Sequence, residues 1–246
     1  MPILANLRPR PDAARALQNY SSLAEGYDST CKRIEALRHR AVAELAPGAG
    51  ETVFDIACGT GPTLVLLAQR VGPAGRVVGV EMSPAMASLA RRRVDTAGVG
   101  ESVEIVESAV ESLRDGPAAD AILCSYTHDV LQSPAAIGRL IDCARPGARI
   151  VLLGMKTLPW IWGWPVNLFN MVRARRYMTT YKNLDRPWRL LEKRGAALSM
   201  VHTALWGSAY IAVGTLPGSC TRRPPGSDMS LNPTTPQVAA PRKAPP

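Results

Sequence analysis

The strongest constraint on the fold is a regular alternation of strand-like and helix-like segments between residues 52 and 154. The strand-like segments are short apolar runs, and runs with helical spacing separate them. This order is typical of right-handed βαβ units on a parallel sheet. The predicted strands are 52–57, 76–81, 103–107, 120–125 and 149–154, and the predicted helices are 62–71, 84–97 and 134–144.

Two further strand-like runs follow at 197–204 and 208–215, and only three residues separate them. A connection this short joins antiparallel strands, so we predict a hairpin. The predicted fold class is therefore α/β: a Rossmann-like, doubly wound, seven-stranded sheet with a C-terminal antiparallel hairpin. A helical pattern over 16–45 precedes the first strand and stops at Pro47 and Gly48.

The chain divides into three parts by composition. Its 246 residues, 46% of them hydrophobic, suffice for one domain of this kind with appendages. We expect a flexible N-terminal arm over 1–15 and the domain over 16–216, with an aromatic and basic insert at 156–194. The last part, 217–246, carries eight prolines and almost no core-forming side chains, so it is predicted to be a disordered tail.

The formal net charge of +9 invites a nucleic-acid or anionic-membrane partner. The charge is concentrated, because 156–194 carries +7 and 217–246 carries +3, which leaves −1 for the rest of the chain. Since the predicted core is near neutral and no RNA-binding motif occurs, nucleic acid is not expected as a partner. An RNA-binding role stays open as an alternative that requires aromatic and basic side chains to line one groove.

The cysteines and apolar runs bear on the compartment. Five cysteines stand far apart without a C-x-x-C pair, which favours a reducing cytoplasm over a disulfide framework or a zinc site, and no metal is expected. The first residues lack the pattern of a signal peptide. No apolar run approaches the ~18 residues of a transmembrane helix. We therefore expect a cytoplasmic chain, with peripheral contact at a membrane left open.

The most informative segment runs from the first predicted strand through a G-x-G turn into a helix. Gly59 and Gly61 let the backbone approach a ligand closely beside free helix N–H groups. Leu64 stands where a dinucleotide-binding fingerprint has its third glycine, so a pyrophosphate site is disfavoured. Asp55, at the strand's end, suits an ammonium or sulfonium group instead, and Glu81 ends the next strand, where an acid can accept from both ribose hydroxyls. The alternative is that Asp55 caps the helix and Glu81 is a solvated strand end.

The letters D-I-A-C-G-T-G and V-V-G-V-E-M-S resemble the first motif and the second-strand acid of class I S-adenosylmethionine-dependent methyltransferases. The resemblance covers roughly residues 16–215. It implies that the amides of Gly59 and Gly61 line the methionine part of the cofactor, that Asp55 orients its amino group, and that Glu81 holds the ribose. The full set of cofactor-binding residues that it implies is Asp55, Ala57, Gly59, Gly61, Glu81, Met82, Ala109 and Ser125.

Two details refine this resemblance. Ala109 stands where close relatives often have Asp, so a backbone contact or Glu111 would have to serve the adenine amine. The layout, with the Tyr27-Asp28 element, most resembles the branch that includes the ubiquinone/menaquinone C-methyltransferases. That branch implies methyl transfer to a small, apolar or aromatic acceptor. The alternatives are a phospholipid or membrane-lipid methyltransferase, or a non-catalytic module that keeps the cofactor pocket.

Methyl transfer from a sulfonium needs mainly in-line alignment, and a base is needed only if the acceptor has a proton to lose. His128 and Tyr126 follow the fourth strand at the edge where open α/β sheets bind ligands, and they are the candidate catalytic residues. His128 as base and Tyr126 as positioning hydroxyl are weighed against purely structural loop roles. The segment lacks the Pro-Pro-aromatic element of nucleobase amino methyltransferases, which disfavours that reaction.

The insert at 156–194 holds seven of the chain's thirteen aromatic residues among its basic side chains. Three interpretations stay open: a cap that walls the substrate pocket, a contact with an anionic membrane surface, and ordinary packing of an amphipathic helix.

Overall fold

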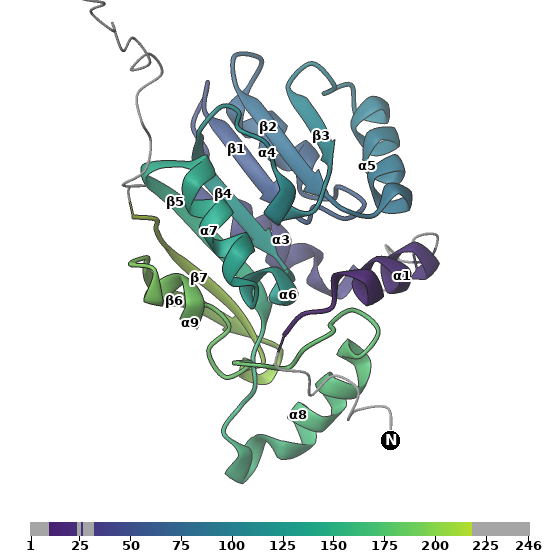
Figure 1. Cartoon of the computed structure of the whole chain (residues 1–246), viewed down its shortest axis with the longest axis vertical. Helices are drawn as coiled ribbons and strands as arrows, with labels where there is room; N and C mark the ends of the chain where they lie inside the picture. Colours follow the sequence, from purple (N-terminus) through teal and green to yellow (C-terminus); the bar gives the residue numbers. More distant parts are fainter. Residues whose placement is uncertain (1–9, 24–25, 27–31, 218–246) are drawn as a thin grey trace, which may run out of the picture.

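The computed structural model describes residues 10–23, 26 and 32–217. Seven strands form one sheet in the order β3-β2-β1-β4-β5-β7-β6 (Figure 1). The strands are β1 (Thr52–Ile56), β2 (Arg76–Glu81), β3 (Val103–Glu107), β4 (Ala119–Ser125), β5 (Ala144–Met155), β6 (Ala197–Ala204) and β7 (Ala209–Thr215). The first five strands are parallel, and β7 pairs antiparallel with both β5 and β6. The predicted fold, including the C-terminal hairpin, is confirmed.

Helices cover both faces of the sheet, as a parallel sheet requires. One face packs against α3 (Glu35–Leu45), α4 (Leu64–Val71) and α5 (Pro84–Thr96). The other face packs against α7 (Pro134–Cys143), α9 (Arg189–Lys193) and the short elements η4 (Val110–Ser112) and α6 (His128–Leu131). Because both faces are covered, β1 is buried almost throughout and reads as a continuous apolar run apart from Asp55.

Several predicted boundaries differ from the observed ones. The helical pattern over 16–45 is not one helix, since α1 (Ala13–Leu23) is separate from η3 (Lys32–Ile34) and α3. The expected arm over 1–15 therefore overlaps a helix that begins at Ala13, while residues 1–9 and the tail from 218 lie outside the described residues. Tyr27 and Asp28 lie outside them too. The helix predicted from Pro62 begins at Leu64, because Pro62 is still part of the glycine turn.

The insert contains one long helix, α8 (Trp160–Ala174), which hangs beyond the end of the sheet near the tip of the β6–β7 hairpin (Figure 1). The tip is a tight turn, η5 (Leu205–Gly207). In contrast, α1 packs near α5, on the side of the carboxyl ends of the strands (Figure 1).

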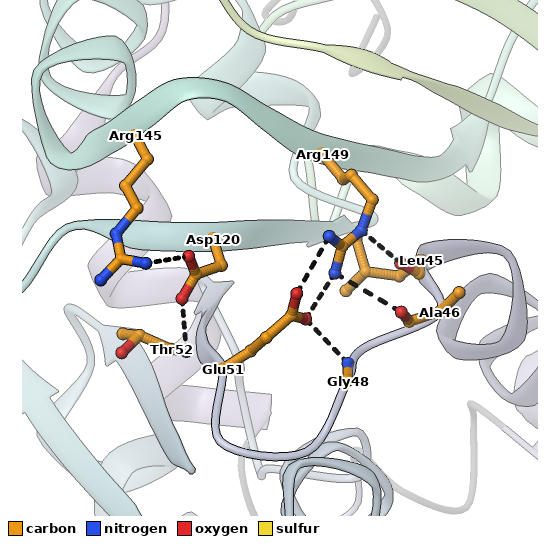
Figure 2. Close-up of polar contacts among 8 residues, drawn as sticks. All are labelled: Leu45, Ala46, Gly48, Glu51, Thr52, Asp120, Arg145 and Arg149. Atoms are coloured by element: carbon orange, nitrogen blue, oxygen red, sulfur yellow. Dashed lines mark hydrogen bonds and ion pairs between the residues drawn. The ribbon is translucent and has the colours of Figure 1, made fainter.

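Ion pairs connect the amino ends of the central strands to each other and to α3 (Figure 2). The Arg149 guanidinium donates to both Glu51 oxygens, with 3.1 Å from Nη1 to Oε1, and to the carbonyls of Leu45 and Ala46 at the end of α3. Asp120 accepts from the Thr52 amide at 2.9 Å and from Arg145. These contacts join α3, β1, β4 and β5 at the edge opposite to the candidate site.

Candidate active site

A cavity opens at the carboxyl ends of the parallel strands, where the strand order reverses between β1 and β4. Ligands of open α/β sheets bind at this switch point. The cavity spans about 900 Å³ of space, counting the part open to solvent. Eight residues predicted from the sequence line it: Ala57, Gly59, Glu81, Met82, Ala109, Ser125, Tyr126 and His128. Asp55 and Gly61, also predicted, do not line it.

The loop after β1 is shaped by left-handed backbone conformations. Ala57, Gly59 and Gly61 have φ values of 50°, 60° and 74°. A Cβ on Gly61 would come within 2.9 Å of the Leu64 side chain and 3.1 Å of the Ala90 Cβ on α5. Gly61 therefore allows close packing of the loop against α5, whereas Gly59 faces the cavity.

Glu81 ends β2 as a buried carboxylate that the backbone holds in place. Its Oε2 accepts from the Gly59 amide at 2.9 Å, and its Oε1 accepts from the Ser83 amide at 2.8 Å. Burial raises the pKa of Glu81, and the amide hydrogen bonds oppose that shift. Each carboxylate oxygen has a second lone pair, so the group can still accept from two hydroxyls of a ligand in the cavity.

Asp55 lies beneath the loop and is almost fully buried. Its Oδ2 accepts from the Thr63 hydroxyl, and its Oδ1 has no hydrogen-bond partner in the structure. Burial raises the pKa of Asp55 to about 7, while the Thr63 hydrogen bond and the Arg38 charge pull it down. An orphaned acidic oxygen in this position fits a cationic group of a ligand.

The end of β3 supplies the wall beside Glu81 and Met82. Ala109 and Glu111 both line the cavity. The Ser108 amide donates to the Glu81 carbonyl at 3.0 Å, which fixes this segment against β2. Glu111 also accepts from the Ser133 hydroxyl at 2.6 Å. The predicted substitute for the missing Asp, Glu111, is therefore at the cavity, next to Ala109.

The end of β4 carries buried polar groups that face the cavity. Tyr126 adopts φ 58°, a conformation that bulky residues rarely take, and its amide donates to the Leu153 carbonyl. The hydroxyl of Ser125 lacks a hydrogen-bond partner in the structure, and the His128 ring lies at the backbone of Lys182. Burial lowers the pKa of His128 to about 4, an effect that the Lys182 backbone opposes only in part. The imidazole is therefore neutral at pH 7, and a pKa this low makes it a weak base before a ligand binds.

A roof over the cavity comes from segments that sequence reasoning missed. Asp129 accepts from the Thr179 hydroxyl and amide at 2.6 and 2.9 Å, and Thr179 in turn accepts from the Asp12 amide at 2.9 Å. The Tyr20 hydroxyl of α1 donates to the Tyr177 carbonyl at 2.9 Å. No local motif predicts these contacts, because they join residues 50 to 167 positions apart in the chain.

The insert contributes less to the cavity than a substrate cap would. Only Tyr177 and Met178 of this segment line it, together with Pro11, Asp12, Ala13, Ala16 and Tyr20. The tryptophans of α8 are exposed rather than turned into the cavity. The interpretation of the insert as a substrate cap stays a prediction, carried here by Tyr177 rather than by the exposed indoles of α8.

Comparison with known proteins identifies methyltransferases as similar to this chain. Residues 53–147, which carry β1 to the start of β5, match the family model of a methyltransferase domain. A demethylmenaquinone methyltransferase of Symbiobacterium thermophilum is 28% identical over 144 residues, 54% of this chain and 56% of that protein. An arsenite methyltransferase of Halobacterium salinarum is 35% identical over 118 residues, 46% of this chain and 29% of that protein. The chain thus matches only part of the length of these curated relatives.

Solved structures share the fold. A SAM-dependent methyltransferase from Aquifex aeolicus superimposes with a TM-score of 0.60 at 20% identity, covering 80% of this chain and 98% of that one. An O-methyltransferase family protein from Burkholderia thailandensis gives 0.63 at 18% identity, covering 88% and 67%. The matched domain and the fold confirm the resemblance inferred from the sequence, to the class I S-adenosylmethionine-dependent methyltransferases. Within that class, the menaquinone branch is represented among the relatives.

Proposed function

We propose that this chain is an S-adenosylmethionine-dependent methyltransferase that transfers the methyl group to a small, apolar or aromatic acceptor by in-line displacement. The observation that carries the proposal is one cavity that the buried Glu81 carboxylate and the Ser125 hydroxyl both line. The Ser125 hydroxyl has no hydrogen-bond partner in the structure, and neither has one oxygen of Asp55 beneath the adjoining loop. Buried polar groups are nearly always hydrogen-bonded in folded proteins, so these two atoms support a ligand at this site.

The residues fit this cofactor. Glu81 would accept from the ribose hydroxyls, since its carboxylate faces the cavity while backbone amides fix its orientation. The orphaned oxygen of Asp55 would compensate the positive charge of the amino acid part. Ala109 and Met82 would pack on the adenine, and Glu111 would serve its amine. When bound, S-adenosylmethionine supplies an activated methyl group on a sulfonium sulfur.

The chain's own contribution to the reaction is alignment and proton removal. Ser125 and Tyr126 would position the acceptor at the end of β4, and enclosure of the pair accounts for most of the rate enhancement. His128 would take the acceptor's proton at a ring nitrogen if the reacting atom carries one. The neutral ring suits this role, since a protonated imidazole would repel the cofactor's positive charge.

The quinone methyltransferases among the relatives support an aromatic, quinol-like acceptor. A screen of quinols and phenols with cofactor labelled on the methyl group tests this directly. We expect label in an extracted product with the wild type and much less with Glu81→Ala at a cofactor concentration near the wild-type Kd. Cofactor binding without transfer to any acceptor class would instead favour the non-catalytic module.

A second candidate, a phospholipid or other membrane-lipid methyltransferase, is favoured by the exposed aromatic face of α8. Label in the phospholipid fraction rather than in quinols would select it. The buried Cys58 and Cys124 are free thiols, which supports placing the enzyme in the reducing cytoplasm, with the membrane as a peripheral contact.

A further inference from the structure

The solvent-facing side of α8 is more apolar than the side that packs on the protein. The packed side consists of Gly163, Asn167, Met171 and Ala174. The exposed large side chains are Trp160, Ile161, Trp162, Trp164, Leu168, Phe169 and Val172, and Ile161 is 95% exposed. A helix of a soluble domain shows the opposite arrangement, so this side lacks its partner.

The orientation of α8 is fixed by specific contacts. The Asn167 side chain accepts from the Leu158 amide at 2.8 Å and donates to the Leu158 carbonyl at 2.9 Å, and all of these groups are buried. Gly163 lies so close to Leu158 that a Cβ would approach the Leu158 Cβ within 2.3 Å. The helix cannot turn its apolar side inward without losing both contacts.

The tip of the hairpin extends the same surface. Leu205 and Trp206 adopt φ values of 50° and 62°, which bulky residues rarely do, and Trp206 is 88% exposed. The Leu158 side chain lies beside both Gly163 and Gly207, which makes the tip a neighbour of α8. We call the exposed apolar side chains of α8, together with Leu205 and Trp206, the tryptophan surface.

The charge around the tryptophan surface has one sign. Residues 155–184 and 196–216 contain no Asp or Glu. Arg173 and Arg176 are exposed at the end of α8, and the Arg173 guanidinium lies 5.6 Å from the centre of the Phe169 ring. Tryptophan with arginine is the composition of segments at the headgroup level of a bilayer, and basic clusters are drawn to anionic lipids.

The length of α8 decides how it could meet a bilayer. Its 15 residues correspond to about 22 Å of helix, short of the ~30 Å hydrocarbon core. Among the described residues, no helix has the length and apolar character to cross a membrane. A short helix with one apolar side and flanking arginines lies in the plane of the interface.

We infer that the tryptophan surface docks on an anionic phospholipid bilayer, with α8 in the interface. Three residues after α8 ends, Tyr177 and Met178 begin the wall of the cavity. Docking therefore brings the cavity to the lipid surface. This last step rests on the proposed function, and it narrows the acceptor to molecules dissolved in the bilayer.

Flotation of the full chain with vesicles tests the docking. We expect the wild type to float with phosphatidylcholine vesicles containing phosphatidylglycerol, and much less with phosphatidylcholine alone or at high salt. The double variant Ile161→Ser/Trp162→Ser should bind the anionic vesicles about tenfold more weakly or worse. Both positions are exposed, so circular dichroism should report an unchanged fold.

A charge-matched pair separates a specific surface from general basicity. Arg173→Gln/Arg176→Gln should reduce flotation, whereas Arg92→Gln/Arg114→Gln, which removes the same charge from α5 and from beyond η4, should not. Equal loss in both pairs would overturn the inference. Failure of the wild type to float at low salt would also overturn it. A wild-type dimer that does not bind vesicles and that Ile161→Ser/Trp162→Ser converts to a monomer would show instead that the surface is a protein interface.

Calorimetry with S-adenosylmethionine keeps the two proposals apart. The surface variants should bind the cofactor as the wild type does. Flotation without any cofactor binding would leave the docking intact and refute the methyltransferase. Cofactor binding and methyl transfer without flotation would support the methyltransferase and refute the docking.

Discussion

The charged groups are paired at the amino edge of the central sheet, whereas polar groups without partners lie at its carboxyl edge. At the amino edge, Glu51 and Asp120 are each paired with an arginine and with a backbone amide. At the carboxyl edge, Asp55 is more deeply buried and one of its oxygens has no partner, and the Ser125 hydroxyl has none either. The polar groups of the first edge are satisfied in the folded chain alone. Under the proposed function, a ligand satisfies those of the second edge, because buried polar groups are nearly always hydrogen-bonded.

The largest effect should come from His128→Ala at the carboxyl edge. Loss of a general base lowers turnover by about 100-fold or more, while cofactor affinity stays unchanged because the imidazole faces the acceptor. Single-turnover kinetics and calorimetry measure the two quantities. His202→Ala on β6, away from the cavity, is the matched control. Unchanged turnover of His128→Ala, with chemistry rate-limiting, would return this residue to a structural role.

Glu81→Ala should weaken S-adenosylmethionine binding at least about tenfold, since both ribose hydroxyls lose their acceptor. Glu107→Ala, at the end of the neighbouring strand, removes an exposed carboxylate that pairs with Arg91 and should leave affinity unchanged. Calorimetry of both variants decides the assignment. Equal affinities of Glu81→Ala and the wild type would refute the ribose role.

The pH dependence of cofactor affinity should follow Asp55. Because the pKa of Asp55 is about 7 and its ionised form suits the cation, affinity should rise about tenfold between pH 6 and pH 8 and then level off. Asp55→Asn should bind more weakly and show a flat profile over this range. A wild-type affinity that does not change with pH would contradict the role of Asp55.

In the protein without cofactor, the raised pKa of Asp55 makes the stability of the fold decrease as the pH rises. A carboxyl group whose pKa is raised on folding contributes stability below its unfolded value of 3.8, and this contribution is lost as the pH rises through 7. Asp55→Asn should therefore unfold at a higher temperature than the wild type at pH 8, but not at pH 4. Thermal melts without cofactor measure this difference.

The smallest effect is expected at the amino edge. Arg149→Met should lower the free energy of unfolding by about 1 kcal/mol, a modest figure because Arg149 and Glu51 are both partly exposed. The Arg149 hydrogen bond lowers the pKa of Glu51, so this stability should be present near neutral pH and fade as the pH falls below about 4.5. Cofactor affinity should not change. If Arg149→Met weakened cofactor binding as much as Glu81→Ala does, the two edges would not differ in function.

The sequence predicted what depends on local pattern. Because the ends of the strands could be predicted, eight of the ten predicted site residues lie at the cavity. Gly61 was assigned to the ligand because a G-x-G turn does not reveal which glycine faces a neighbouring helix. Tyr20 and Thr179 escaped prediction because their partners are distant in the chain.

The outward face of α8 could not be read from periodicity either. Apolar residues surround most of this helix, so the pattern does not tell which side is buried. The buried side is decided by Asn167, whose bonds to the Leu158 backbone appear only in the folded chain.

The central claim is that the carboxyl edge of the sheet is a cofactor site. A crystal structure with S-adenosylhomocysteine, the product form of the cofactor, tests it most directly. The account predicts this ligand in the cavity, with its ribose hydroxyls on the Glu81 carboxylate and its sulfur toward Ser125 and His128. A cavity that stays empty at saturating ligand, or a ligand held elsewhere on the chain, would contradict it.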